Sequence, residues 1–195
     1  MKVAATLTEN LLADNIISKK EVNIINYGLE SLIGNIIGLL VILVIGAFFD
    51  HIIDSLIVWL LAFPLRKYAG GFHARTRGRC LITSMGLILV SYIIFFQCRW
   101  KTVDVFLMAL TFSIIIFFLA PVGTPNKPLD KEEKTVYRRR TREFLVLEEI
   151  LLFFALCINL ERLVTAITIC FFMVGMSLLA GKVKSENYNR KGKKS

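Results

Sequence analysis

The chain has 195 residues, a formal net charge of +9 and 55% hydrophobic residues. Its mean hydropathy of +0.63 is too high for a soluble domain, whose surface must be largely polar. The basic residues lie in blocks between long apolar runs, which favours a lipid bilayer over nucleic acid as partner. The four cysteines have no C-x-x-C spacing, so we expect no disulfide framework and no metal site. We also expect no cofactor.

The N-terminal 30 residues alternate between apolar and charged positions. Between Ala4 and Tyr27 the apolar residues recur at roughly helical spacing, which predicts one or two amphipathic helices. These helices either lie on the membrane face or pack on the rest of the protein.

Six apolar runs follow, and a helix needs about 20 residues, with a lower limit near 17, to cross a bilayer. The second run is the weakest because it is short and contains Asp54 and Pro64. The pattern predicts an all-α integral membrane protein with a single polytopic domain over residues 1–181 and about six transmembrane helices over 32–180. The runs are Leu32–Phe49, Ile52–Leu65, Leu81–Gln97, Val103–Ala120, Phe144–Leu160 and Leu163–Ala180.

The distribution of Lys and Arg predicts the orientation of these helices. With both termini in the cytoplasm, only Arg99, Lys101 and Arg162 lie outside, and the other 21 of the 24 basic residues lie inside. This asymmetry is the one that positive residues impose on membrane proteins. Residues 182–195 are basic and polar, which predicts a disordered tail near anionic lipid.

The basic loop between the second and third runs contains His73 and Cys80. Cysteine nucleophiles need a nearby base, which is usually histidine. On one straight helix a separation of seven residues is roughly 10 Å along the axis, too far for a hydrogen bond. Gly70, Gly71 and Gly78 allow the chain to fold back. The alternative is a surface histidine and a buried thiol without chemistry.

Cys80 begins the third run and has Arg75, Arg77 and Arg79 before it. A helix N-terminus and neighbouring positive charge both favour a thiolate, which is the environment of a reactive cysteine. The same arginines are equally suited to anchoring the loop at lipid phosphates.

The chain contains two short motifs. The first is R-x4-G-x-H-A with H-x6-C, at Arg66, Gly71, His73, Ala74 and Cys80. The second is A-P followed by N-K-P, at Ala120, Pro121, Asn126, Lys127 and Pro128. Together they resemble the accessory gene regulator protein B (AgrB) family of quorum-sensing peptide processors in Gram-positive bacteria.

The resemblance implies a multi-pass cysteine endopeptidase in the bacterial cell membrane with its active site at the cytoplasmic face. Its partner would be a small AgrD-like precursor peptide with an amphipathic N-terminal region. The enzyme would cut off the C-terminal region of this peptide through an acyl-enzyme thioester and allow cyclisation to a thiolactone or lactone. Cys80 would be the nucleophile and His73 its base, while the roles of the motif residues Arg66 and Gly71 stay open.

The carboxylates Asp54, Glu148 and Glu149 lie inside apolar runs, where an ionised group is unfavourable unless it is paired or faces a polar cavity. One interpretation is that one of them reaches the His73–Cys80 pair or the substrate. The other, which we favour, is pairing with Lys or Arg near the inner interface. His51 falls on the outer side, so we expect no catalytic role for it.

Four arginines precede the fifth run, at Arg138, Arg139, Arg140 and Arg142. The resemblance suggests that they dock the acidic end of the precursor, although control of topology explains the same charges. A small non-enzymatic membrane transporter or scaffold protein would also account for the six runs and the basic loops. It would leave the glycine-flanked His73 and Cys80 without a purpose. The sequence leaves a homodimer open.

Overall fold

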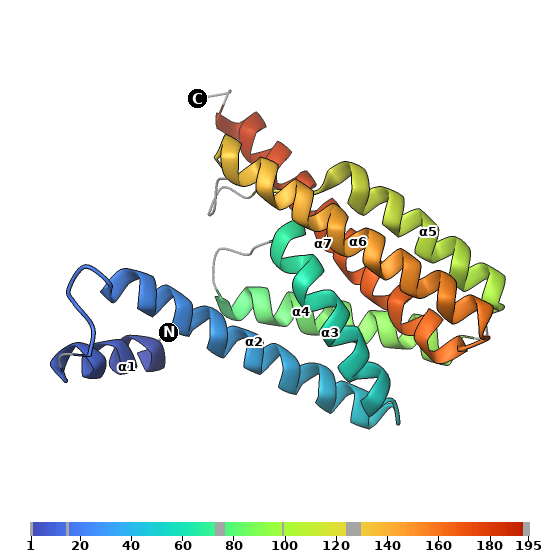
Figure 1. The fold of residues 1–195 in the computed structure, drawn as a ribbon, viewed down its shortest axis with the longest axis horizontal. Helices are drawn as coiled ribbons and strands as arrows, with labels where there is room; N and C mark the ends of the chain where they lie inside the picture. Colours follow the sequence, from blue (N-terminus) through green and yellow to red (C-terminus); the bar gives the residue numbers. More distant parts are fainter. Residues whose placement is uncertain (1, 15, 73–76, 99, 124–129, 193–195) are drawn as a thin grey trace. The chain divides into compact units, whose positions relative to one another are not determined.

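The computed structural model describes residues 2–14, 16–72, 77–98, 100–123 and 130–192, and over these ranges the chain is helical (Figure 1). The predicted all-α class is therefore confirmed. The helices are α1 (Lys2–Ala13), α2 (Val22–Phe48), α3 (Ile52–Ala69), α4 (Arg77–Tyr92), η1 (Ile93–Gln97), α5 (Thr102–Leu119), α6 (Lys131–Cys157) and α7 (Glu161–Gly192), with η1 a π-helical continuation of α4.

Four helices in the described ranges are long and apolar enough to cross a membrane: α2, Gly78–Gln97, α5 and Glu161–Glu186. The second and fifth predicted spans also form helices, α3 and α6. They differ from the other four because α3 contains Asp54, Arg66 and Lys67, and the second half of α6 still contains Glu148 and Glu149.

The chain divides into two compact units, residues 1–41 and 42–195. In the first unit, the Ser18 N–H and hydroxyl both donate to the Glu21 carboxylate, at 2.9 and 2.6 Å, just before α2 begins. α2 then continues without a break from Val22. The last part of the predicted amphipathic region, from Val22 onwards, therefore forms the first turns of α2. The first predicted span does not begin a separate helix at Leu32. No proline interrupts this stretch, so the helix propagates.

The second unit is organised around α7. Of the apolar stretch of α7, 72% is buried, against 22% for each of α4 and α5, so α7 is the central helix. Apolar residues of α3, α5 and α6 pack around it, among them Leu65, Ala109, Ile116, Leu145 and Leu152. On α7 itself, Ile167, Phe171 and Leu178 belong to the same core cluster.

The central helix is longer than the sixth apolar run. It continues to Gly192, whereas the sequence predicts a disordered tail from residue 182. Extending a helix that already exists fixes one residue per hydrogen bond, and no proline follows Ala180. Basic and polar composition alone therefore did not stop the helix.

Candidate functional site

The site begins where α3 ends. Gly70 and Gly71 have φ angles of +74° and +122°, which favour glycine because it lacks a Cβ. A Cβ on Gly70 would collide with the carbonyl oxygen of Val122. The predicted break at these two glycines is confirmed. Gly78, by contrast, lies inside α4 and breaks nothing.

The two segments that carry the sequence motifs lie side by side. The Val122 N–H donates to the carbonyl oxygen of Ala69 at 3.0 Å, and the Gly71 N–H donates to the carbonyl oxygen of Val122 at 3.3 Å. On the other side, the Phe72 N–H donates to the carbonyl oxygen of Ser177 in α7 at 2.9 Å. The segment that leads to His73 is therefore hydrogen-bonded to two different parts of the fold.

Cys80 lies in the first turn of α4 and is half-buried. Arg66, in the last turn of α3, reaches towards the same helix, and its Nη2 lies 3.5 Å from the hydroxyl oxygen of Ser84. Ser84 follows Cys80 by one turn, so both share a helix face. Arg66 is also near enough to interact electrostatically with Cys80. The structure thus brings Arg66 to Cys80, and adds Ser84, which only its spacing of four from Cys80 could have suggested.

Several predicted residues lie outside the described ranges. These are His73, Ala74 and Arg75 of the first motif, and Asn126, Lys127 and Pro128 of the second. The structure describes Phe72 and the backbone of Arg77 on either side of the first gap.

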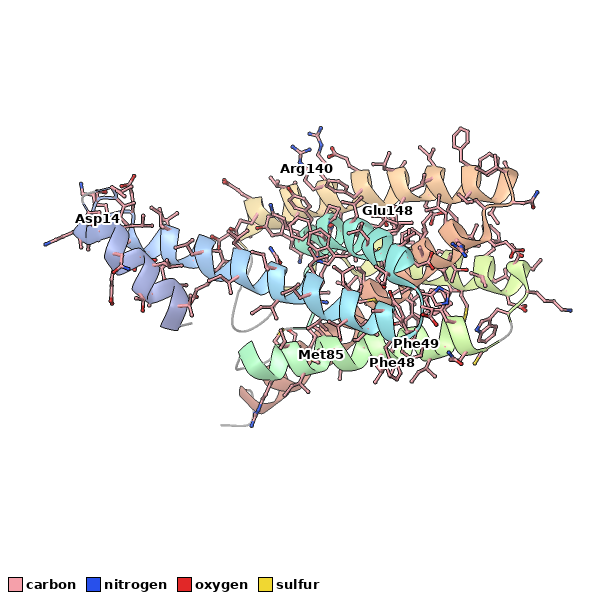
Figure 2. The ribbon with its side chains drawn as sticks, turned by 90° about the horizontal axis from the view of Figure 1, so that it is seen from below. Asp14, Phe48, Phe49, Met85, Arg140 and Glu148 are labelled. Atoms are coloured by element: carbon pink, nitrogen blue, oxygen red, sulfur yellow. The ribbon has the colours of Figure 1, made fainter. Side chains whose placement is uncertain are left out.

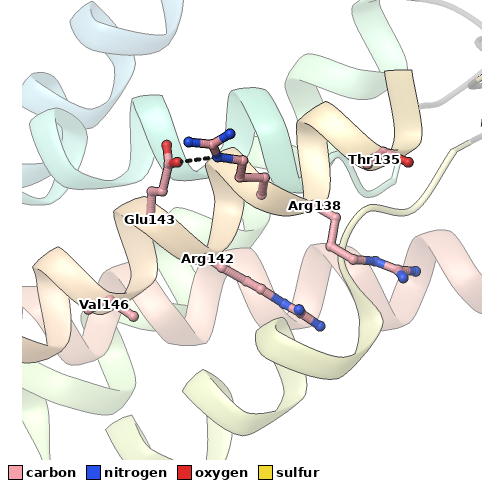
Figure 3. A pocket seen from close by; sticks show the side chains of 6 residues that line it. Thr135, Arg138, Arg142, Glu143 and Val146 are labelled. Carbon is pink, nitrogen blue, oxygen red and sulfur yellow. Dashed lines mark hydrogen bonds and ion pairs between the residues drawn. The ribbon is translucent and has the colours of Figure 1, made fainter. Parts of the chain in front are cut away.

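The arginine cluster lies on α6, and Arg138, Arg139 and Arg142 of this cluster line an open groove of about 660 Å³ (Figure 3). Glu143 accepts from Arg139 at 2.8 Å and from Arg140 at 3.1 Å. The hydrogen bond from Arg139 is the main cause that holds the pKa of the Glu143 carboxyl below its ordinary value. Arg138 and Arg142 have no carboxylate partner in the described part of the chain, and Arg142 lies over the Phe117 ring at 4.3 Å. The groove is lined by Thr135, Arg138, Arg139, Arg142, Glu143 and Val146.

The groove side and the other side of α6 differ. In Figure 3 the guanidinium groups of Arg138 and Arg142 extend in the same direction. Arg140 does not line the groove, and Figure 2 shows it projecting away from the bundle.

Tyr68 at the end of α3 stacks on Phe144 with ring centroids 5.7 Å apart. The arginine-bearing turns of α6 are therefore held next to the end of α3 that carries Arg66.

Within the described residues, the acidic side chains inside the apolar runs do not pair with the Lys or Arg that the sequence favours. Asp54 accepts from or shares a proton with His51, with Oδ2 and Nδ1 2.7 Å apart, so pairing with a Lys or Arg is wrong for Asp54. Buried Glu148 contacts the Cys170 thiol at 3.6 Å, and Glu149 has a buried oxygen with no hydrogen-bond partner within the described residues.

His51 lies far from Cys80. Its ring stacks on Phe96 with centroids 3.7 Å apart, and Phe96 lies in η1, at the opposite end of the helix that Cys80 begins. Sixteen helical residues separate these two positions by about 24 Å along the axis. His51 and Asp54 therefore do not belong to the site around Cys80.

A bundle of long apolar helices, with a cysteine and basic side chains gathered at one end, defines a polytopic helical membrane protein. The sequence profile described as Accessory gene regulator B matches residues 2–178, and the chain belongs to this family. The resemblance of the two motifs is confirmed. No solved structure matches the chain significantly.

Three curated relatives are similar in sequence. "Putative AgrB-like protein 2" of Clostridium perfringens is 33% identical over 68% of this chain and 63% of its own length. "Accessory gene regulator protein B" of Staphylococcus lugdunensis is 32% identical over 54% of this chain and 56% of its own length. "Protein FsrB" of Enterococcus faecalis is 24% identical over 59% of this chain and 48% of its own length. The matched region thus spans less than two thirds of each relative.

Proposed function

We propose that this protein is a membrane-embedded cysteine endopeptidase that processes a small quorum-sensing precursor peptide. The observation that carries the proposal is the convergence of Arg66 on the α4 face that begins with Cys80. The same end of the bundle holds the backbone of Phe72, the residue before His73. Family membership supports the same activity.

In the proposed first step His73 accepts the thiol proton and the Cys80 sulfur attacks the scissile carbonyl carbon. The C–N bond breaks, His73 gives the proton to the leaving amine, and the N-terminal part of the peptide stays on Cys80 as a thioester. In the second step a thiol or hydroxyl of the peptide gives its proton to His73 and attacks the thioester carbonyl carbon. The bond between this carbon and the Cys80 sulfur breaks, His73 returns the proton to the sulfur, and the ring is closed.

The energetics of these two steps call for a dry site. Forming a thioester from an amide is uphill in free energy, whereas exchange between two thioesters is nearly balanced. Cyclisation must therefore be faster than hydrolysis of the acyl-enzyme, which would destroy the intermediate. Closing a site against water prevents such a side reaction. The position of half-buried Cys80 at the end of a membrane bundle would limit the access of water without a separate lid.

The proposed topology places α2–α7 across the bacterial cell membrane as six spans with both termini in the cytoplasm. Cys80, the Arg138–Arg142 cluster and the end of α7 then share the cytoplasmic face. We propose that the groove beside Arg138 and Arg142 receives the acidic C-terminal region of the precursor. These two guanidinium groups have no carboxylate partner in the described chain, so an acidic segment would complement them.

The decisive experiment is co-expression of this chain with the precursor peptide from the neighbouring reading frame, with release of the C-terminal fragment followed by mass spectrometry. Cys80→Ala and His73→Ala should each abolish release while the protein remains inserted in the membrane. Cys98→Ala and Cys157→Ala, at exposed cysteines, are the matched controls and should retain release. Release by Cys80→Ala at a rate near that of the wild type would contradict the role of Cys80 as nucleophile. Absence of release by the wild type itself would favour a non-enzymatic scaffold.

A further inference from the structure

Helix α7 contains no residue of either sequence motif, yet it contacts the segment that leads to His73. We propose that Ser177 and Gly181 of α7 are a positioning pair for His73, because together they fix the backbone of Phe72, the residue immediately before it. This inference rests on the proposed function, since it gives His73 the role of the base.

The first contact is a hydrogen bond to a single residue of α7. The Phe72 N–H donates to the Ser177 carbonyl oxygen at 2.9 Å, and the Ser177 hydroxyl oxygen lies 3.2 Å from the same nitrogen. Ser177 is only 5% exposed, so water does not compete for these acceptors. The carbonyl oxygen is a main-chain acceptor, so Ser177→Ala removes only the hydroxyl contact. A displacement of Phe72 would separate its buried N–H from both acceptors and leave it unsatisfied, which is more unfavourable than losing an exposed bond.

Gly181 makes this contact possible. It follows Ser177 by one helical turn, and residues four apart lie on the same helix face. A Cβ on Gly181 would lie 2.8 Å from the Gly71 carbonyl carbon and 3.0 Å from the Phe72 nitrogen. A side chain at this position would therefore occupy the space through which Phe72 approaches the Ser177 carbonyl.

Gly71 provides the matching space on the other side. A Cβ there would lie 2.6 Å from the Ser177 hydroxyl oxygen, so neither Gly71 nor Gly181 has room for a side chain where the two segments meet. The Phe72 ring is also held by α7, because the Lys184 ammonium nitrogen lies 4.8 Å from its centroid. Both the main chain and the side chain of Phe72 are thus fixed by the central helix.

Fixing Phe72 matters because His73 is one peptide bond away. A catalytic group works only when it is held in reacting geometry, and a displacement of about 1 Å can lower the rate about a hundredfold. Changes at Ser177 or Gly181 should therefore act through His73 on the reactivity of Cys80, and leave the rest of the bundle intact.

The test measures the rate at which iodoacetamide alkylates Cys80 in the purified full-length protein, from about pH 5 to about pH 9, by peptide mass spectrometry. Near pH 6, Gly181→Ala should lower this rate about tenfold and Ser177→Ala about threefold, so that both profiles move towards that of His73→Ala. Gly86→Ala, which adds a Cβ in open space on α4, and Ser91→Ala, at a buried serine bonded within its own helix, should match the wild type.

The same digest reports folding, because buried Cys170 should stay protected in every variant. In the His73→Ala background, adding Gly181→Ala should cause no further change. Wild-type profiles for Ser177→Ala and Gly181→Ala, or a further loss in the His73→Ala background, would overturn the positioning role while leaving the proposed function standing. If Gly181→Ala exposes Cys170, the Ser177→Ala profile decides. A wild-type profile for His73→Ala itself would contradict the proposed function and the positioning role together.

Discussion

The Val122 N–H donates to the carbonyl oxygen of Ala69 at 3.0 Å, and this bond joins two segments that lie about fifty residues apart in the sequence. Ala69 ends α3 three residues after Arg66, and Val122 follows the Ala120–Pro121 motif. The second motif therefore has a structural role, because the residue that follows its Ala120–Pro121 pair is hydrogen-bonded to the segment that leads to His73.

Substitution of Gly70 tests the contact between the end of α3 and Val122. Gly70→Ala should abolish most precursor cleavage and destabilise the fold by about 1–2 kcal/mol, because a left-handed backbone is unfavourable for alanine and the added Cβ would collide with Val122. Thermal unfolding in detergent and cleavage per inserted molecule measure the two effects. Gly86→Ala should leave both unchanged, and equal behaviour of the two variants would contradict the close approach of Gly70 to Val122.

Arg66 should act through its charge. We expect Arg66→Gln to lower kcat for cleavage about tenfold or more, since a positive charge next to a reacting thiolate is lost. Ser84→Ala should lower it only about twofold, because a 3.5 Å contact is a weak hydrogen bond. Single-turnover cleavage at saturating peptide gives the measurement. A larger effect of Ser84→Ala than of Arg66→Gln would assign the main role to Ser84.

The arginine cluster offers a comparison between residues of equal charge. If the groove docks the acidic end of the precursor, Arg138→Gln should raise KM several-fold with little change in kcat. Arg140→Gln, which lies outside the groove, should change KM little. High salt should reduce the difference, because the native attraction is then already screened over the Debye length of about 8–10 Å.

Control of topology predicts another result for the same two variants. Arg138→Gln and Arg140→Gln would then reduce correct insertion equally. The kinetics of cleavage per correctly oriented molecule would match the wild type. Equal KM values for the two variants at low salt would leave the arginines as topology signals only.

Reporter fusions test the six-span arrangement. Fusions after Arg79, after Arg142 and at the C-terminus should report the cytoplasm, and fusions near His51, Lys101 and Arg162 the outside. An outside signal after Arg79 would remove α3 from the spans and place Cys80 on the opposite face.

Buried Glu148 should tolerate loss of its ionisable group but not replacement by a positive charge. Glu148→Gln keeps a hydrogen-bonding partner for Cys170 and should preserve the amount of folded protein in the membrane. Glu148→Lys places an uncompensated charge among α6 and α7 and should abolish it. If Glu148→Gln alone removed cleavage while the protein stayed folded, the carboxylate would have a role in the chemistry.

The sequence by itself determined the helical class and the location of the apolar segments, because both depend on local composition and periodicity. It also pointed to Cys80 and to the break at Gly70 and Gly71, since a backbone with positive φ needs glycine wherever it occurs. The family followed from the same motifs.

Only the tertiary structure decided which segments meet. Ser84 reaches Arg66, Val122 bonds to Ala69, and Ser177 bonds to Phe72 through contacts between residues that are distant in the chain. Backbone atoms make the last two of these contacts, so no residue type in the sequence signals them. The wrong prediction for Asp54 also concerned which residues meet. Its place in an apolar run indicated that the carboxylate is buried, but only the structure showed that His51, at the turn before α3, is its partner.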